Sequence, residues 1–179
     1  VQTVLSGPAA GVVGASRAAA ADESSFEGFV TFDMGGTSSD VSLVRDGGVE
    51  RTTDNEIGDY PTRVPMVDVT TVGAGGGSIA WVDSGGALRV GPRSAGSDPG
   101  PACYGRGGKQ PTVTDANLVL GYVNRETKLG GELDLEYEAA VDALARLADE
   151  ADLGSPIEAA QGVFRVANAN MTRAIRSVT

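Results

Sequence analysis

The middle of the chain consists of short runs in which apolar and β-branched residues alternate with polar ones, separated by glycine-rich turns. Such runs predict strands rather than helices. Turns at residues 46–48, 73–78 and 84–86 connect the runs and predict a β-rich core over about residues 26–113. We expect strands at residues 29–33, 40–44, 49–52, 79–83 and 87–90, and one buried strand at residues 64–72.

Helical periodicity flanks this core on both sides. An alanine-rich stretch over residues 6–21, with Pro8 in its first turn, predicts one helix. After the core, Thr114 or Asp115 is expected to cap a helix that runs through Leu120. The order of elements predicts an α/β or α+β layout with a mixed sheet, and of the two we expect an α/β protein whose sheet is flanked by helices. Two amphipathic helices are expected in the C-terminal part (residues 114–179), over residues 136–153 and, after a capping box at residues 155–158, over residues 157–178.

We expect residues 1–179 to form a single partial domain. A chain of 179 residues can bury a core of its own. However, the sequence begins with Val1 rather than Met, and Thr179 falls within a helical pattern without a stop signal. Both ends therefore look truncated, and we interpret the sequence as a piece of a longer protein.

The chain is strongly acidic. It carries 24 acidic and 14 basic residues, for a net charge of −10, so a nucleic acid would be repelled and is not expected as a partner. Lysine occurs only at Lys109 and Lys128. This bias suits a halophilic protein, in which salt screens the self-repulsion. An ordinary acidic cytoplasmic protein fits the composition equally well.

Cysteine content and the length of the apolar runs bear on the compartment. Cys103 is the single cysteine, so no intrachain disulfide can form, which fits a reducing compartment. No apolar run approaches the roughly 18–20 residues of a membrane span, and no signal peptide is visible. We therefore expect a cytoplasmic protein without a membrane partner.

Histidine is absent from the chain. A Ser-His-Asp or Cys-His nucleophile and a histidine-ligated zinc site are therefore excluded within these 179 residues. Any metal would be held by oxygen ligands, which favours Mg²⁺ or another hard cation.

Residues 32–41 read Phe-Asp-Met-Gly-Gly-Thr-Ser-Ser-Asp-Val and carry the strongest functional pattern in the chain. Two carboxylates, Asp33 and Asp40, enclose two glycines and three hydroxyl residues. A carboxylate at the end of an apolar strand is costly unless it serves a cation. Asp33 is therefore the candidate ligand of a hydrated Mg²⁺, and Asp40 is a second candidate catalytic acid. An ordinary hairpin would need neither acid.

Between the two acids lie several hydrogen-bond donors. The N–H groups of Gly35 and Gly36 can approach an anion closely because no Cβ intervenes, and Thr37 and Ser38 add hydroxyl groups. The run is not a Walker A loop, because no Gly-Lys-Ser or Gly-Lys-Thr follows, nor is it the dinucleotide fingerprint. It predicts a phosphate-binding turn.

A second glycine turn contains Gly75, Gly76 and Gly77 and ends at Ser78. It resembles the dinucleotide fingerprint only loosely, since Ser78 stands where the third glycine is required. A tight crossover turn is the simpler explanation of these glycines. The alternative is a second turn that faces phosphate or nucleoside.

A long loop over residues 91–108 is rich in proline and glycine, a type of loop that is more often functional than idle. Cys103 lies in this loop without a histidine base, so we expect a packed, inert thiol. Asp98 and Asp115 are candidate acids near it. Asp98 can equally start a turn, and Asp115 can cap a helix.

Five runs, in one order, carry a family likeness. The runs are residues 6–11, 33–41, 73–80, 94–105 and 111–117. Together they resemble hydantoinase A, a family that includes 5-oxoprolinase and the ATP-using subunits of acetone-type carboxylases. The resemblance implies an actin/Hsp70-like (ribonuclease H-like) nucleotide-binding fold. It also implies ATP-driven opening of a cyclic amide, of the hydantoin or 5-oxoproline type, by phosphorylation of a carbonyl oxygen.

The resemblance also implies roles for single residues. Asp33 would hold the Mg²⁺ ion, and Asp40 would position water or the metal shell. Residues 35–38 would bind the phosphates of ATP, and residues 75–78 would wall the nucleotide. The family usually carries a histidine where this chain has Thr70, which leaves the substrate open.

Such enzymes usually work with a second large subunit of the hydantoinase B type. The first glycine-rich hairpin of the fold is expected upstream, so the parent protein is predicted to be the enzyme and the isolated chain to be inactive. One alternative is an ATP-dependent carboxylase subunit or a kinase of the same fold. The other is a non-catalytic nucleotide-binding clamp.

Overall fold

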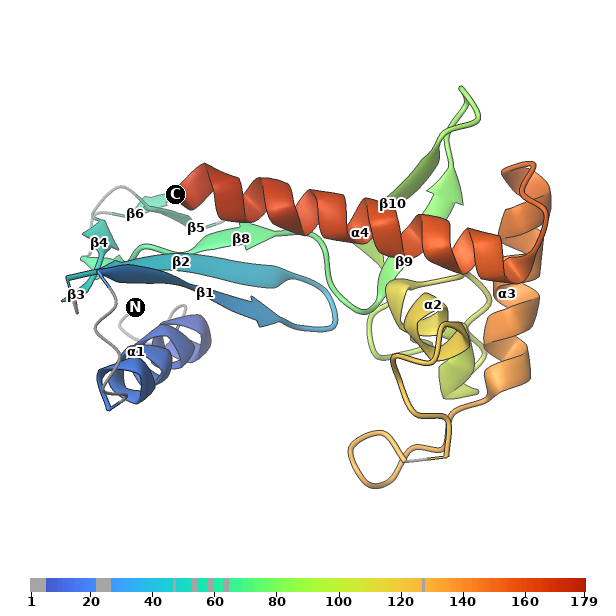
Figure 1. Ribbon diagram of the computed structural model, residues 1–179, viewed down its shortest axis with the longest axis horizontal. Helices are drawn as coiled ribbons and strands as arrows, with labels where there is room; N and C mark the ends of the chain where they lie inside the picture. Colours follow the sequence, from blue (N-terminus) through green and yellow to red (C-terminus); the bar gives the residue numbers. More distant parts are fainter. Residues whose placement is uncertain are drawn as a thin grey trace. The chain divides into compact units, whose positions relative to one another are not determined.

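The computed structural model describes residues 6–21, 27–46, 48–52, 55–57, 60–62, 65–126 and 128–179. Helices and strands occur along the same chain, as predicted for an α/β protein (Figure 1). The described residues divide into two compact units. Unit 1 contains the residues up to Asp33, those from Ser39 to Val72 and those from Arg173 to Thr179, and unit 2 contains residues 34–38 and 73–172.

Unit 1 is built on a four-stranded sheet whose central strand is β2 (Ser39–Arg45). This strand neighbours β1 (Gly28–Met34) and pairs antiparallel with β3 (Gly48–Val49) and β8 (Thr70–Val72). Val41 and Val44 are three residues apart, so their side chains lie on opposite faces of the strand, and both are fully buried. Strand β2 is therefore covered on both faces. The strands at 29–33 and 40–44 are thus confirmed.

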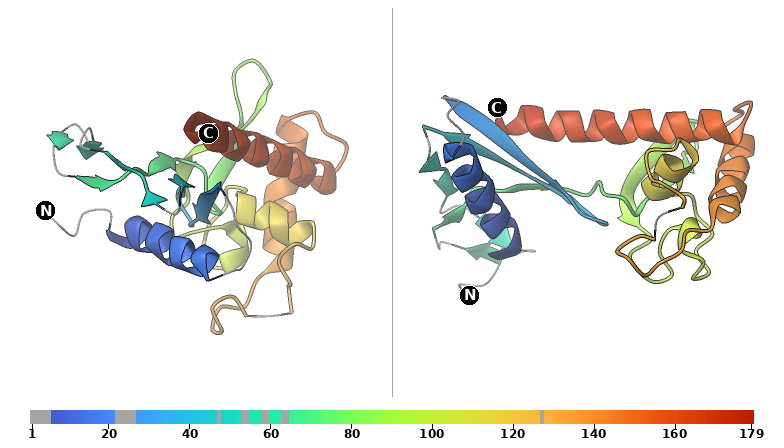
Figure 2. Two further views of the ribbon diagram at one scale, coloured as in Figure 1. Left: turned by 60° about the vertical axis from the view of Figure 1, so that its left-hand side comes forward. Right: turned by 60° about the horizontal axis from the view of Figure 1, so that its bottom comes forward.

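The first helix of unit 1, α1 (Ser6–Ala20), follows the predicted stretch at residues 6–21 and lies beside the sheet (Figures 1 and 2). Val12 is its buried residue. Because six of its fifteen residues are alanine and three are glycine, the helix can lie close to the strands with few large side chains between them.

The prediction of one buried strand at residues 64–72 is wrong. Within the described residues, β7 (Met66–Val67) and β8 are separate and at most half-buried. The run changes partner in its middle, since β7 pairs with β4 (Arg51–Thr52) and β8 pairs with β2. The strand expected at 49–52 is also interrupted, at Glu50. The carbonyl of Glu50 accepts a hydrogen bond from the N–H of Asp68, which lies in the gap between β7 and β8. A second small pair is formed by β5 (Asn55–Ile57) and β6 (Tyr60–Thr62).

Unit 2 packs three helices around the hairpin of β9 (Ser78–Val82) and β10 (Leu88–Ser94). Its core contains aliphatic side chains from all of these elements. The helices are α2 (Val113–Val119), α3 (Tyr137–Glu150) and α4 (Pro156–Val178), of which α4 contributes its residues up to Thr172 to this unit (Figure 2). The main buried side chains are Ala80, Val90, Val113, Ala116, Leu144, Leu147, Ala159, Ala160 and Val163.

Two boundaries in unit 2 differ from the prediction. Strand β10 continues through an irregularity past Val90 to Ser94, so the loop expected from residue 91 starts later and contains the short 3₁₀ helix η1 (Ala102–Tyr104). The N-cap of α2 is Thr112 rather than Thr114 or Asp115. Asp115 is instead at the N3 position of the helix, where it forms a capping box with Thr112.

The pairs β2–β3, β2–β8, β4–β7, β5–β6 and β9–β10 are all antiparallel. The prediction of a mixed sheet is wrong for these pairs, since none of them is parallel. Parallel neighbours would need a crossover connection between the two strands. The described helices lie before β1 or after β10 and cross over between none of the paired strands. Among the described helices, none has the length and apolar character needed to cross a membrane.

Candidate functional site

Two glycine turns meet in unit 2. The first, residues 35–38, follows β1 and is closed by a hydrogen bond from the N–H of Gly35 to the carbonyl of Ser38, at 2.8 Å. The second, residues 73–78, precedes β9. The N–H of Gly76 donates to the carbonyl of Gly35 at 3.0 Å, and the N–H of Gly77 donates to the carbonyl of Gly36 at 2.6 Å. The structure therefore brings together two turns that the sequence predicts as separate phosphate-facing elements.

The two turns contact each other through backbone atoms, which explains why glycine occurs at two positions of the second turn. A Cβ at Gly75 would lie 2.7 Å from the carbonyl oxygen of Gly35, and a Cβ at Gly77 would lie 2.9 Å from that of Gly36. Such distances are too short for real side chains. Glycine is needed at both positions because only it permits so close an approach.

The second turn uses its own donors inside the protein. The N–H of Gly75 donates to the hydroxyl of Ser78 at 2.8 Å, and the N–H of Ser78 donates to the carbonyl of Gly75 at 3.0 Å. Ser78 is fully buried. With Gly76 and Gly77, the backbone N–H groups of residues 75–78 thus all have protein acceptors. In this geometry the second turn supports the first.

The first turn keeps its donors outward. Gly36 and Thr37 are exposed, and among the described residues neither backbone N–H has an acceptor and the Thr37 hydroxyl has no partner. A bound anion could receive all three of these donors. Ser38 is half-buried beside them. An exposed turn with several free donors in one short run has the composition of an anion-binding nest.

Helix α2 holds the second turn from behind. The backbone N–H and the hydroxyl of Thr114 both donate to the carbonyl of Gly76, at 2.8 and 2.9 Å. The N–H of Ala95 donates to the carbonyl of Gly77 at 2.8 Å. Sequence reasoning missed this role of Thr114, because a contact across 38 residues leaves no local pattern.

Asp115 is buried and organises the long loop. Its carboxylate accepts the N–H and hydroxyl of Thr112, at 2.8 and 2.7 Å, and the N–H groups of Ala102 and Cys103, at 3.3 and 2.8 Å. A fully buried acid with four donors is satisfied as a structural group. The spacing Thr-x-x-Asp was the available signal for this capping box.

The remaining candidates in the long loop show no reactive geometry. The Cys103 side chain is fully buried, and burial, followed by the nearby charge of Asp115, raises the pKa of its thiol well above the usual range. The expectation of a packed cysteine is confirmed. Burial likewise raises the pKa of Tyr104. Asp98 is exposed on a turn.

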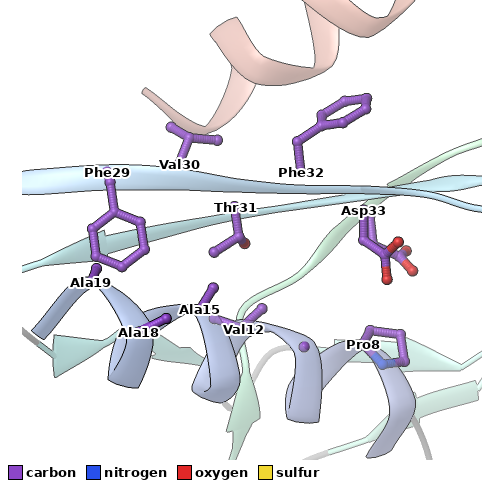
Figure 3. A pocket seen from close by; sticks show the side chains of 12 residues that line it. Pro8, Val12, Ala15, Ala18, Ala19, Phe29, Val30, Thr31, Phe32 and Asp33 are labelled. Atoms are coloured by element: carbon purple, nitrogen blue, oxygen red, sulfur yellow. The ribbon is translucent and has the colours of Figure 1, made fainter. Parts of the chain in front are cut away.

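The two predicted acids lie in unit 1, where Asp33 and Asp40 both line a pocket of about 510 Å³. Figure 3 shows Asp33 on the face of β1 that is turned toward α1, at the Pro8 end of the pocket. Asp40 accepts a hydrogen bond from the hydroxyl of Thr71 at 2.6 Å. The other walls are mostly apolar and come from α1 and β1: Gly11, Val12, Ala15, Ala18, Ala19, Phe29, Val30, Thr31 and Phe32.

The donor set for a metal is small. Among the described residues, no three acidic or cysteine side chains gather as a metal cluster. Asp33 is exposed and belongs to neither of the two ion pairs found among the residues that the structure describes. Mg²⁺ commonly binds through one or two carboxylates, with phosphate oxygens and water completing its shell. One exposed carboxylate fits that mode and does not fit an all-protein cage.

Thr70 is half-buried on β8 and lies opposite Val41 of β2. Its neighbour Thr71 lies opposite Asp40 and supplies the hydroxyl that Asp40 accepts. Sequence reasoning missed Thr71 as the partner of Asp40. The register between β2 and β8 places them together, and this register cannot be read from either strand alone.

Comparison with known proteins gives the same family along the whole chain. The hydantoinase/oxoprolinase family profile matches residues 1–179. The alpha subunit of caprolactamase from Pseudomonas jessenii is 49% identical over 152 residues, which cover 84% of this chain and 22% of that subunit. The 5-oxoprolinase of Saccharomyces cerevisiae is 40% identical over 190 residues, which cover 100% of this chain and 14% of the enzyme.

Solved structures agree with these matches. A nucleotide-free structure of acetone carboxylase superposes with a TM-score of 0.86 at 33% identity, covering 98% of this chain and 24% of the carboxylase chain. The structure of the ATP-dependent caprolactamase from P. jessenii superposes with a TM-score of 0.77 at 46% identity, over 86% of this chain and 22% of that one. The chain thus spans no more than about a quarter of these relatives. By sequence and by structure, it belongs to the hydantoinase/oxoprolinase family.

Proposed function

We propose that this chain is part of an ATP-dependent enzyme that opens a cyclic amide and that it supplies one half of an actin-like nucleotide-binding cleft. The observation that carries the proposal is the turn at residues 35–38. Its outward N–H groups at Gly36 and Thr37 and its free Thr37 hydroxyl form a preorganised set of donors for phosphate oxygens. Relatives named for lactam and 5-oxoproline substrates support the reaction class.

In this proposal each residue has one task. Gly35 fixes the turn through its hydrogen bond to Ser38, while Gly36 and Thr37 bind phosphate oxygens. Asp33, which precedes the turn by two residues in the chain, holds a hydrated Mg²⁺.

The remaining predicted residues complete the site. Asp40, oriented by the hydroxyl of Thr71, positions water. Residues 75–78 wall the nucleotide and keep the phosphate turn in place. When bound, ATP supplies the phosphoryl group that activates the carbonyl of the cyclic amide for attack. A partner subunit is part of the proposal, because the caprolactamase relative is named as one subunit of its enzyme.

A second candidate is an ATP-dependent carboxylase subunit. The likeness to acetone carboxylase, with its TM-score of 0.86, favours it specifically. The two candidates share the phosphate turn and differ in the substrate. A kinase of the same fold and a non-catalytic clamp would also bind ATP, but neither would couple its hydrolysis to ring opening.

The test is the substrate dependence of ADP release by the full-length protein together with its partner subunit. Hydantoin, 5-oxoproline and caprolactam are each added with Mg·ATP, and acetone or acetophenone with bicarbonate forms the second arm. We expect a cyclic amide to stimulate ADP release and to be opened in equal amount. The Asp33→Asn variant, purified in the same way, controls for contaminating ATPases. Stimulation only by a ketone with bicarbonate, or by no substrate, would contradict the proposal.

A further inference from the structure

We infer that Thr114, in the first turn of α2, is a positioning residue for ATP binding, although it belongs to neither glycine turn. The inference rests on the proposed function of the turn at residues 35–38. Thr114 acts through hydrogen bonds to the second turn, and the second turn acts through hydrogen bonds to the first.

The first step is the contact between Thr114 and Gly76. Two donors of one residue, the backbone N–H and the hydroxyl, converge on a single carbonyl oxygen, at 2.8 and 2.9 Å. A Cβ at Gly76 would lie 2.9 Å from the Thr114 hydroxyl, so the two residues are as close as a glycine allows. The carbonyl of Gly76 is thereby fixed in direction as well as in place.

The second step joins the peptide groups on either side of Gly76 to the phosphate turn. The N–H of Gly76 donates to the carbonyl of Gly35, and the N–H of Gly77, which belongs to the same peptide unit as the Gly76 carbonyl, donates to the carbonyl of Gly36. Because a peptide unit is planar and rigid, fixing its carbonyl also fixes its N–H. The carbonyl of Gly36 is likewise in one peptide unit with the N–H of Thr37, which is a proposed phosphate donor.

The first turn of α2, from which Thr114 donates its hydrogen bonds, is itself anchored. Helix α2 begins at a capping box in which the buried Asp115 holds Thr112, and the same carboxylate holds the backbone of Cys103. The first turn of α2 is therefore tied to the rigid loop before it and cannot shift alone. Two planar peptide units lie between the Thr114 hydroxyl and the N–H of Thr37, so loss of that hydroxyl is expected to loosen the donor geometry.

The experiment compares Thr114→Val with Thr114→Ser in the full-length protein with its partner subunit. Valine keeps the shape and removes the hydroxyl, whereas serine restores it. We expect Thr114→Val to raise the KM for ATP by up to about tenfold, the upper size for the loss of one neutral hydrogen bond, here a half-buried one, with a smaller change in kcat. Thr114→Ser should stay within about twofold of the wild type. Thr172→Val, the same change at an exposed position of α4, is the matched control.

Hydrogen exchange without ATP gives a second readout that does not depend on catalysis. The peptide that covers residues 73–78, in which the N–H groups of residues 75–78 are hydrogen-bonded, should exchange faster in Thr114→Val and return to the wild-type rate in Thr114→Ser. The N–H groups of Gly36 and Thr37 have no acceptor among the described residues and are not used as reporters. If Thr114→Val does not fold, Thr114→Ala removes the hydroxyl without adding bulk, and the same expectations apply.

The results separate this inference from the proposed function. If Thr37→Val weakens ATP binding while Thr114→Val changes neither the KM for ATP nor the exchange of residues 73–78, the positioning role is wrong and the proposed function stands. If Thr37→Val has no effect on ATP binding, the phosphate turn is wrong, and the role of Thr114 toward ATP falls with it.

Discussion

The two glycine turns look alike in sequence and differ in the structure. Each follows a strand and combines glycines with hydroxyl residues, at 35–38 and at 73–78. The backbone N–H groups of residues 75–78 all have protein acceptors, whereas those of Gly36 and Thr37 have none among the described residues. Glycines therefore serve two purposes here. In one turn they leave donors open to solvent, and in the other they allow two backbones to meet.

The difference shows that a glycine-rich turn is not by itself a phosphate site. The space at each glycine separates the cases. Gly36 has no atom within 4 Å of an added Cβ, while Gly75 and Gly77 would place theirs within 3 Å of a backbone carbonyl. A phosphate turn needs both kinds, because free donors bind well only if something else holds them still.

The largest expected effect comes from substitution of Asp33, the acid that precedes the turn at residues 35–38. Asp33→Ala in the full-length protein should lower kcat for ATP hydrolysis by roughly 10²–10³-fold or more, since Asp33 is proposed to hold the Mg²⁺ ion that would stabilise the charge developing on the phosphate. The fold should stay intact because Asp33 is exposed and has no ion pair among the described residues. Steady-state ADP release and circular dichroism measure the two parts.

Asp46→Asn is the control for this loss of charge. Asp46 is exposed and has a φ of 50°, a backbone conformation that asparagine tolerates well. Wild-type turnover is expected for this variant. Retained turnover in Asp33→Ala would remove Asp33 from the mechanism.

A pair of alanine variants then tests whether the second turn supports the first while the first turn supplies the free hydrogen-bond donors. Gly77→Ala should lower the free energy of local opening of residues 73–78 by about 1–3 kcal/mol, because its Cβ meets the carbonyl of Gly36 and the hydroxyl of Ser94, each at 2.9 Å. Gly36→Ala has open space and should change it by less than about 0.5 kcal/mol. Hydrogen exchange of the two variants measures this difference. Equal effects would contradict the division of roles.

The smallest expected effect is a pH dependence of stability that comes from Cys103, which is held by Asp115 and is not part of the phosphate turn. Burial raises the pKa of the Cys103 thiol, so the native state keeps its proton while the unfolded thiol ionises near its usual pKa of about 8.5. Unfolding is then favoured as the pH rises. Stability should fall above about pH 8.5, by at most about 1.4 kcal/mol per pH unit.

Denaturant unfolding at pH 8 and pH 10 measures this slope. Cys103→Ala should remove the contribution of the thiol, although the variant has a small cavity and is less stable at every pH. An equal slope in both proteins would show that Cys103 ionises freely in the native state.

Much of the fold could be predicted from the sequence because its signals are local. The alanine-rich stretch of α1 and the capping box at Ser155 mark helices by spacing alone. The run at residues 64–72 misled because β-branched residues report burial and strand propensity but not the partner strand. Its change of partner, from β4 to β2, depends on contacts far along the chain.

The candidate site divides in the same way. The acids and donors of residues 33–38 can be proposed from the sequence, because an ionised carboxylate at the end of an apolar strand is costly when it is buried. Asp33 is exposed in the structure, so this cost does not apply there, and the roles of these residues stay a prediction. The support by Thr114 and Asp115 could not be found in full, since it consists of hydrogen bonds to Gly76 and Cys103 over long separations in sequence. Only the Thr112–Asp115 spacing was readable in advance.

The central claim is that the turn at residues 35–38 binds the phosphates of ATP. Calorimetric titration of the full-length protein with Mg·ATP tests it most directly, with Thr37→Val and Thr37→Ser compared with the wild type. Loss of one hydrogen bond to a charged group predicts a Kd about tenfold or more weaker for Thr37→Val, and restoration to within about twofold for Thr37→Ser. An unchanged Kd for Mg·ATP in Thr37→Val would contradict the account.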